Sequence, residues 1–466
     1  MDRATKNLYF NLCNPDVPLE PHNEANVDLD SLNPNAPLRG ENWVNKLADE
    51  IEFSIGDPAA RMRKPACIYF TGLPGSGKST EILRLRERLQ GQKLLVVLID
   101  ADYRLDLTDV IDISDIYIAI LYEVERQVLI AEGKNPDTPG NGVFARLGEL
   151  LESMSIDNVK LQVSVLGVLA LEMKEQPSLR RQVRSRVAAH TRTFLQHCRL
   201  ELQQLQERAQ KCGYAAVAVL LDSLEKLNGT STNADIVLDS AERLFSHSGA
   251  QHLALPVHVL YTLPPSLFLR LRTHIDIEFM PMIKLWERPR DGEAPGHRRL
   301  YQSGLDAAEQ LIRKRIPNED LLRWFFGVNT AEALSERLQR VILWSGGYPR
   351  EIIRLLRNVI RSAPLTPQHF ERLLKGSGSA YTNLLLGKDL PWLARVATKN
   401  VLLPQDEEER QAADRMFRNN VVLRYVNTSE WFDLHPAVRE MDEVKEAIQK
   451  LQSANAAPPS STQPEP

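Results

Sequence analysis

The 466-residue sequence has few cysteines, no long apolar run and almost balanced charges. Its four cysteines show neither metal-ligand nor redox spacing, which favours a reducing compartment. No apolar stretch approaches the roughly 20 residues of a membrane-spanning helix, and the N-terminus lacks a signal-peptide core. The net charge of −4 provides no overall positive field for nucleic acid or an anionic membrane. We therefore expect a cytoplasmic protein without a membrane partner.

The composition is that of an ordinary globular protein, with 43% hydrophobic and 25% charged residues. At roughly 100–200 residues per domain, the length predicts two to four domains. Residues 1–38 are rich in Asn, Asp and Pro and predict an extended arm that is ordered only where it packs on something. Residues 451–466 are rich in Ser, Pro, Gln and Ala and predict a disordered tail.

The most informative stretch matches the phosphate-binding pattern G-x-x-x-x-G-K-[ST]. An apolar strand is predicted before it, at Cys67–Thr71, and an amphipathic helix after it, at Ser79–Gln90. Backbone N–H groups of the glycine loop and the helix N-terminus would bind phosphate oxygens of ATP. Lys78 would reach the β- and γ-phosphates, and Ser79 would ligate Mg²⁺. The predicted nucleotide-binding residues are Gly72, Leu73, Pro74, Gly75, Ser76, Gly77, Lys78, Ser79 and Thr80.

A second acidic motif follows the apolar run Ala215–Leu221, which predicts a buried strand. The strand ends in Asp222. Downstream of a phosphate-binding loop this arrangement is typical of a Walker B motif, whose Asp helps to hold Mg²⁺. Ser223 follows and cannot act as a base at neutral pH. The next carboxylate is Glu225, which either acts as the base for the attacking water or faces solvent beside Lys226.

Three further apolar runs predict additional strands: Leu94–Ile99, Val257–Tyr261 and Ile277–Leu285. Pro281 predicts that the last of these lies at an edge of the sheet or contains a bulge. Asp102 and Asp106, after the first run, either cap turns or face the ligand crevice at the carboxyl ends of the strands. Strands that alternate with helical segments predict the α/β class.

Helical segments flank these strands. Ser114 is the expected N-cap of a helix that runs through Val128. The segment Val44–Phe53 is either a solvated linker or a helical lid over the adenine.

Residues 156–212 predict an insertion that combines a hairpin or irregular strand at Val159–Lys174 with a long helix or helical pair at Ser178–Lys211. This segment carries a basic cluster, which is either a solvated face or a surface for a partner or nucleic acid. The cluster comprises Arg180, Arg181, Arg184, Arg186 and Arg192.

The C-terminal part of the sequence is mainly helical. Helices at Gly304–Arg315, Leu334–Trp344 and Glu351–Ile360 predict a small helical domain. Further helices around 368–375, 389–397 and 406–418 precede two short apolar runs, at Val421–Val426 and Trp431–Leu434. Helices followed by a short hairpin indicate a winged helix.

Taken in order, these motifs resemble the AAA+ ATPases of the STAND and origin-recognition branch over residues 39–435. Besides the two Walker motifs, Thr262 resembles a sensor-1 residue, and Arg350 in Gly347-Tyr348-Pro349-Arg350 resembles a sensor-2 arginine. The resemblance implies an α/β P-loop core, a helical lid and a C-terminal winged-helix-like domain. It also implies ATP and Mg²⁺, with Ser79 and Asp222 at the metal.

The resemblance extends to the catalytic set and the partners. It implies that Asp222, Glu225, Thr262 and Arg350 act in hydrolysis, and that the chain assembles as a homo-oligomer or with a partner protein. It also implies an arginine finger from a neighbouring subunit. The finger candidates are Arg288, Arg290, Arg298 and Arg299.

We expect five regions: an arm at 1–38, a core at 39–300, a lid at 301–363, a winged-helix-like domain at 364–450 and a tail at 451–466. The expected function is a slowly hydrolysing ATP-dependent switch in bacterial signalling or phage defence. One alternative is a DNA-associated ATPase. The winged helix favours it, but the acidic run 406–409 does not, because contacts with phosphates dominate non-specific DNA affinity. A small-molecule kinase is a third alternative and would need an acceptor-site base.

Overall fold

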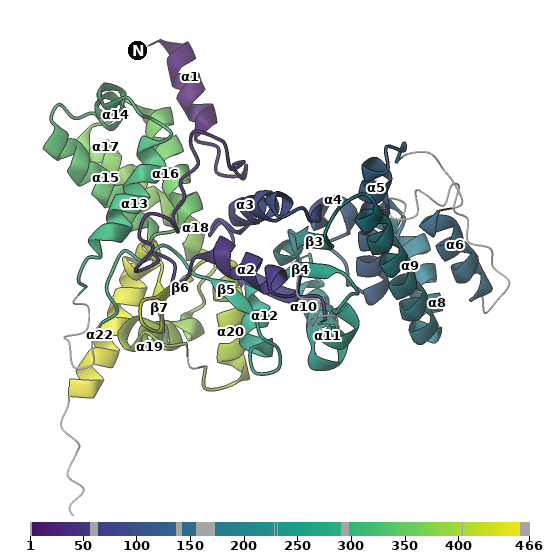
Figure 1. The fold of residues 1–466 in the computed structure, drawn as a ribbon. Coiled ribbons are helices and arrows are strands. Elements are labelled where there is room, and N and C mark those ends of the chain that lie inside the picture. The colour runs from purple at the N-terminus through teal and green to yellow at the C-terminus, as the bar shows by residue number, and fades with distance from the viewer. Residues whose placement is uncertain are drawn as a thin grey trace, which may run out of the picture. The chain divides into compact units, whose positions relative to one another are not determined.

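The computed structural model describes residues 2–55, 64–136, 142–154, 173–227, 229–230, 232–289, 298–402 and 404–456 (Figure 1). The chain forms two compact units. The first, here called the sheet unit, comprises Trp43–Gly72 and Lys78–Phe279. The second, here called the helical unit, comprises Met1–Asn42, Leu73–Gly77 and Met280–Pro466. Leu73–Gly77, five residues of the predicted phosphate-binding loop, thus belong to the helical unit, although the residues on both sides of them in the chain belong to the sheet unit.

One five-stranded sheet has the order β2-β3-β4-β1-β5. The neighbours β2 and β3, β3 and β4, and β4 and β1 pair in parallel. The strands are β1 (Cys67–Gly72), β2 (Leu95–Asp100), β3 (Val217–Asp222), β4 (His258–Thr262) and β5 (Glu278–Met280). Asp100 lies opposite Asp222 in the register, and Phe70 lies opposite Thr262. The carboxyl ends of these strands therefore bring the predicted Walker B residue and Thr262 to one edge, where β1 leads into the phosphate-binding loop.

The sequence of these strands explains their position in the sheet. All six residues of β3 are buried, as expected for a central parallel strand that is covered on both faces. The edge strand β5 ends directly before Pro281, which has no N–H to donate to a neighbour. The predicted α/β class is confirmed for this core, and β5 is shorter than the predicted Ile277–Leu285.

Helices cover the sheet in the first unit. The helix α3 (Lys78–Gly91) packs against β2 and β3, and α2 (Trp43–Glu52) packs against α3. The helix α5 (Ile113–Ala131) packs against β2 and against α9 (Thr191–Lys211). Figure 1 shows α5, α6, α8 and α9 gathered together. The remaining elements are α4 (Ala101–Arg104), α6 (Val143–Ser153), α8 (Pro177–Ala189), η3 (Leu224–Lys226), α10 (Ala234–Phe245), α11 (His247–Leu253) and α12 (Pro265–Leu271).

Two sequence predictions about these helices have clear outcomes, and a third prediction falls largely on residues that the structure does not describe. Asp112, and not Ser114, is the N-cap of α5, because its carboxylate accepts from the Ser114 N–H and forms a capping box with Asp115. The described part of the insertion is a helical pair, α8 and α9. The predicted hairpin at Val159–Lys174 lies almost entirely outside the described residues.

The helical unit contains α13 (Gln302–Arg313), α14 (Glu319–Phe326), α15 (Ala331–Ser345), α16 (Pro349–Ser362) and α17 (Pro367–Ser377). The helix α16 contacts the other four, and its buried residues recur at helical spacing, from Ile352 and Ile353 to Val359 and Ile360. The predicted extended arm is wrong for its first residues. Arg3–Leu12 form a helix, α1, which is capped by Asp2 and packs on α16.

The last part of the helical unit pairs helices with a hairpin. The antiparallel strands β6 (Val422–Val426) and β7 (Glu430–Leu434) pack with α19 (Leu390–Lys399) and α20 (Glu407–Arg418). The other elements are α18 (Ser379–Thr382), η4 (Gly387–Asp389), α21 (Pro436–Arg439) and α22 (Asp442–Ala456). The prediction of a disordered tail is therefore wrong for residues 451–456, and residues 457–466 lie outside the described chain.

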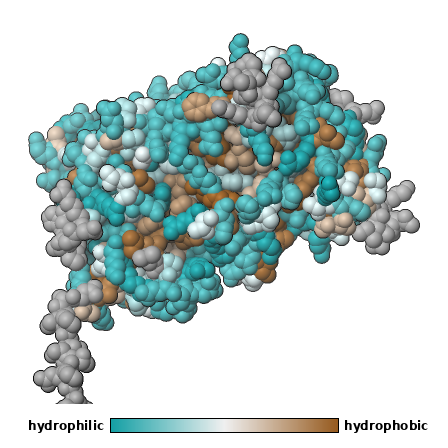
Figure 2. All heavy atoms as spheres, turned by 60° about the horizontal axis from the view of Figure 1, so that its bottom comes forward, coloured by the Kyte–Doolittle hydropathy of each residue, from teal (hydrophilic) through white to brown (hydrophobic). Residues whose placement is uncertain are grey.

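Hydrophilic residues predominate over the face of the molecule drawn in Figure 2. None of the helices in the described residues has both the length and the apolar character that crossing a membrane requires.

Candidate functional site

The predicted phosphate-binding lysine, Lys78, is the first residue of α3 and is only 3% exposed. Its Nζ donates to the carbonyl of Gly72, at 2.9 Å, and lies 3.7 Å from Oε1 of Glu225. The helix begins at this residue because the preceding Gly75 and Gly77 have φ of +80° and +104°, which suit glycine. A buried ammonium group therefore lies at the end of β1, held by a carbonyl and a carboxylate.

Asp222 lies at the end of β3 and is 8% exposed. Its carboxylate accepts a hydrogen bond from the Ser223 N–H at 2.7 Å. Burial, and next the nearby charge of Glu225, raise the pKa of Asp222 to about 6, whereas its interaction with the Ser79 side chain lowers the pKa. Ser79 and Asp222, the two residues that were predicted to hold Mg²⁺, therefore lie beside each other.

Glu225 lies in the one-turn helix η3 that follows Asp222. Ser223 turns the chain with a φ of +70°, and the Thr262 hydroxyl then accepts from the Leu224 N–H at 3.0 Å and donates to the Leu221 carbonyl at 3.3 Å. Within the described residues, the buried Oε2 of Glu225 has no hydrogen-bond partner. The side chain of Glu225 is only 11% exposed, which contradicts the solvent-facing alternative. Thr262 therefore holds the turn that positions Glu225.

The tip of the phosphate-binding loop, Leu73–Gly77, is held by two segments of the helical unit. The Arg350 N–H donates to the Gly75 carbonyl at 3.3 Å, and the Asn420 side-chain N–H donates to the Pro74 carbonyl at 3.2 Å. A Cβ on Gly75 would lie 2.6 Å from the Tyr348 ring, so this position also requires glycine for space. Two consecutive carbonyls of the loop are thus fixed from outside the loop.

The predicted sensor-2 residue, Arg350, is the second residue of α16. Its Nε donates to the Pro15 carbonyl at 3.3 Å, which joins the arm to α16. Burial, more than any nearby charge, raises the pKa of the neighbouring Tyr348 to about 12. The sequence provides no signal for the contact with Pro15, because the acceptor is a backbone carbonyl, and every residue has one whatever its side chain.

The contact of Asn420 with the loop was also missed by sequence reasoning. Asn420 and its partner Pro74 are separated by 346 positions along the chain. The only local signal is the pair Asn419-Asn420 before an apolar run, which is typical of a turn.

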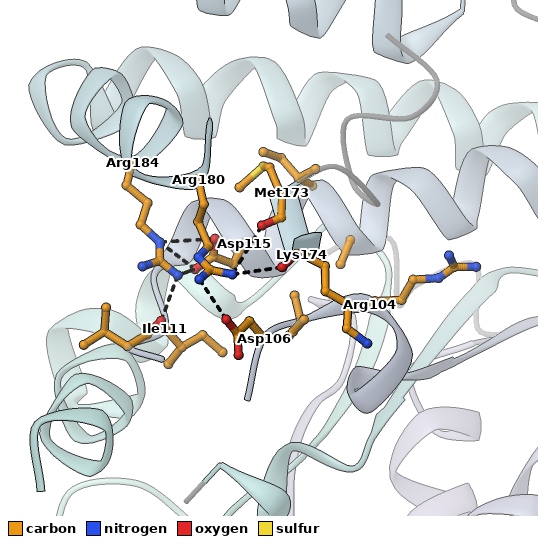
Figure 3. A pocket seen from close by; sticks show the side chains of 12 residues that line it. Arg104, Asp106, Ile111, Asp115, Met173, Lys174, Arg180 and Arg184 are labelled. Atoms are coloured by element: carbon orange, nitrogen blue, oxygen red, sulfur yellow. Dashed lines mark hydrogen bonds and ion pairs between the residues drawn. The ribbon is translucent and has the colours of Figure 1, made fainter. Parts of the chain in front are cut away.

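Three of the five arginines of this basic cluster, Arg180, Arg184 and Arg186, are mostly buried, which contradicts the solvated-face alternative for them. Arg180 pairs with Asp106 at 2.8 Å and with Asp109 at 3.0 Å, and Arg184 pairs with Asp115 at 2.7 Å. The buried Arg186 donates to the Leu151 carbonyl at 3.0 Å. Figure 3 shows Arg180 and Arg184 directed into a pocket beside the loop that follows β2. These arginines therefore hold α8 on the sheet unit.

Other sequence alternatives are resolved by side-chain contacts. Asp106 accepts from the Thr108 N–H at 3.1 Å, which caps a turn, and Asp102 pairs with Lys226 at 3.0 Å. The helix α2 buries Trp43 and Leu47, so the solvated-linker alternative for this segment is wrong.

The candidate finger arginines have different surroundings. Arg298 pairs with Asp433 and lies 4.8 Å from the centre of the Trp286 ring, and Arg288 donates to the Ser429 hydroxyl. Arg290 lies outside the described residues.

Comparisons with known proteins give limited similarity. No family model matches the chain, and no curated protein matches it. Among solved structures, a Walker-type ATPase of Pyrococcus abyssi is 12% identical, with a TM-score of 0.37 over 87% of this chain and 95% of that chain. Cdc6p from Pyrobaculum aerophilum is 12% identical, with a TM-score of 0.33 over 95% and 98%. The ORC2 protein of Aeropyrum pernix is 11% identical, with a TM-score of 0.36 over the same shares.

Proposed function

We propose that this chain binds ATP with Mg²⁺ at the loop Gly72–Ser79 and hydrolyses it slowly, as an AAA+ or STAND-like molecular switch. The observation that carries the proposal is that the Asp222 carboxylate, at the end of β3, lies beside Ser79 and near the buried Lys78. A Walker A pattern by itself predicts a phosphate-binding loop. The nearby carboxylate of Asp222, at the end of β3, would add the second protein ligand that a metal–nucleotide site needs.

The residues at this site fit a magnesium ion bound together with a nucleotide. Among the described residues no group of three or more His, Cys, Asp or Glu side chains could hold a metal alone. Mg²⁺ commonly keeps several waters and takes only one or two protein oxygens besides phosphate oxygens. Ser79 and Asp222 would supply those oxygens, and the bound ion would neutralise charge that develops on the phosphates.

The chain's own groups would perform the other steps. Lys78 would exchange its contacts with Gly72 and Glu225 for phosphate oxygens, in a buried position where a charge-assisted hydrogen bond is strong. Glu225 would then be released from Lys78 and could accept a proton from the attacking water through its unpartnered Oε2. Because Ser223 stands where many ATPases have this glutamate, we propose a slow turnover, which suits a switch.

The switch requires a contact that differs between ATP and ADP. We propose that the Arg350 side chain provides this contact by binding the γ-phosphate of ATP, and that it gives up its hydrogen bond to the Pro15 carbonyl when it does so. We further propose that the chain is organised in the five regions expected from the sequence and that residues 364–450 form a winged-helix-like domain. We also propose that the chain assembles with a second copy or with a partner protein, in signalling or phage defence. The hairpin β6–β7 after α19 and α20 supports the winged helix.

The alternative of a DNA-associated ATPase gains no support from the charges of α20, whose first turn carries three glutamates, Glu407, Glu408 and Glu409.

The test is Lys78→Ala in isothermal titration with Mg²⁺ and ATP, with the exposed Lys211→Ala as the matched control. We expect Lys78→Ala to weaken binding at least about 100-fold, because it removes a charge-assisted phosphate contact from a buried loop. Lys211→Ala should bind as the wild type does. Equal affinity of the wild type and Lys78→Ala would contradict the proposed site.

A further inference from the structure

Asn420 lies in the turn between α20 and β6, and two observations set it apart from an ordinary turn residue. It is 7% exposed, and its side-chain N–H donates to the Pro74 carbonyl at 3.2 Å. Within the described residues the amide oxygen Oδ1 has no partner, so the contact with Pro74 is the only hydrogen bond of this side chain there. Both residues belong to the helical unit.

The backbone alone does not account for an asparagine at this position. Asn420 has a φ of +55°, and the Val421 N–H donates to the Met416 carbonyl, which is the pattern that ends a helix with a left-handed residue. Glycine satisfies this backbone at lower conformational cost, as Gly327 does after α14. The asparagine amide adds the contact with the phosphate-binding loop, which glycine cannot make.

We infer that Asn420 is a positioning residue of the phosphate-binding loop. In a trans peptide the C=O and the next N–H point in opposite directions. Because the Pro74 C=O points toward Asn420, the Gly75 N–H of the same peptide points to the opposite side, where we infer that phosphate binds. The Arg350 N–H holds the following carbonyl, that of Gly75, in the same way. This inference rests on the proposed nucleotide binding.

The contact also couples two parts of the chain. Asn420 is directly followed by Val421 and β6, so a change in the loop on nucleotide binding is transmitted to the hairpin β6–β7. Coupling of this kind is reciprocal, since each partner stabilises the other by the same factor. Nucleotide should therefore slow amide hydrogen exchange in β6.

The experiment compares Asn420→Gly and Asn420→Asp with the wild type, using titration of Mg·ADP and Mg·ATP. Asn420→Gly keeps the favoured backbone and removes the donor, and we expect about threefold to tenfold weaker binding of both nucleotides, the scale of one net hydrogen bond. Both are affected because the loop cradles the phosphates that they share. Asn420→Asp should bind more weakly still, because a carboxylate oxygen would face the Pro74 carbonyl.

Asn400→Gly is the matched control. Asn400 also has a positive φ, of 56°, and its side chain also donates to a backbone carbonyl, that of Phe432 at 3.1 Å. We expect its nucleotide affinity to equal that of the wild type, and we expect ADP to slow exchange in β6 in this control but not in Asn420→Gly.

Three outcomes would overturn the inference. If Asn420→Gly binds ADP as the wild type does, or if both glycine variants weaken binding equally, Asn420 has at most a structural role. If the wild type and Lys78→Ala both fail to bind nucleotide, the proposed function fails together with this inference.

Discussion

At the scale of single residues, Glu225 is the group that we propose as the general base of hydrolysis. Its carboxylate lies 3.7 Å from the Lys78 ammonium, and Thr262 fixes the turn before it. We expect Glu225→Gln to bind ATP but to hydrolyse it roughly 10²–10⁴-fold more slowly, the usual effect of losing a general base. Single-turnover hydrolysis at saturating ATP measures this rate directly.

Asp222→Asn is the informative comparison for this prediction. It should weaken Mg²⁺-dependent binding as well as turnover, because the carboxylate proposed to hold the ion together with Ser79 is lost. A rate for Glu225→Gln within a few-fold of the wild type would remove Glu225 from the mechanism.

We expect His258 in β4 to make the free energy of unfolding sensitive to acid. Burial lowers its pKa from the usual 6.5 to about 4, and its Nδ1 accepts from the Ala66 N–H at 3.1 Å. Between pH 6.5 and 4, His258 is protonated in the unfolded chain but neutral in the folded chain. The contribution of His258 to stability is therefore fully present above pH 6.5 and is lost as the pH falls towards 4. The free energy of unfolding should fall by up to about 1.4 kcal/mol per pH unit in this window.

The measurement is urea unfolding at several pH values. His258→Asn retains an acceptor for Ala66 and should show a shallower loss between pH 6.5 and 4 than the wild type. The exposed His247→Gln is the control and should leave the slope unchanged. Parallel curves for His258→Asn and the wild type would mean that His258 does not supply this dependence.

At the scale of elements, Arg180 attaches the inserted helix α8 to the loop after β2. Its guanidinium pairs with Asp106 and Asp109 and donates to the Met173 carbonyl at 3.3 Å. Arg180→Met should lower the free energy of unfolding by about 1–3 kcal/mol, because it leaves polar groups without their charged partner. The loss is limited because both aspartates are partly exposed, by 25% and 39%.

Denaturant unfolding of Arg180→Met and Arg181→Met tests this prediction. Arg181 is the next residue of α8 but is exposed, so its loss should cost little. If both variants unfold at the same denaturant concentration, the buried pairs do not stabilise the insertion.

At the scale of the whole molecule, the proposed switch predicts a mass that depends on the nucleotide. Size-exclusion light scattering should show a larger assembly with Mg·ATP than with Mg·ADP, since only ATP carries the γ-phosphate proposed to engage Arg350. Lys78→Ala should remain at the mass of the nucleotide-free protein. A wild-type mass that is the same under all conditions would contradict assembly of this chain with itself.

The sequence alone determined the features that depend on neighbours along the chain. The strands β1 to β4, the loop Gly72–Ser79 and the helix after it were predicted, because periodicity, glycine positions and apolar runs act over a few residues. The acidic end of β3 was predicted for the same reason. Local signals also misled at the N-terminus, where polar residues predicted an arm and the chain forms α1 by packing on α16.

Only the tertiary structure decided which distant groups meet. Arg180 is charged and lies in a basic run, yet it is buried because Asp106 and Asp109 lie opposite it. Asn420 looks like a turn residue, yet its side chain donates to the carbonyl of Pro74, which lies 346 positions away in the sequence. Sequence periodicity reports which face of an element is apolar but does not report which element covers that face, and the surroundings of these two residues depend on the covering element.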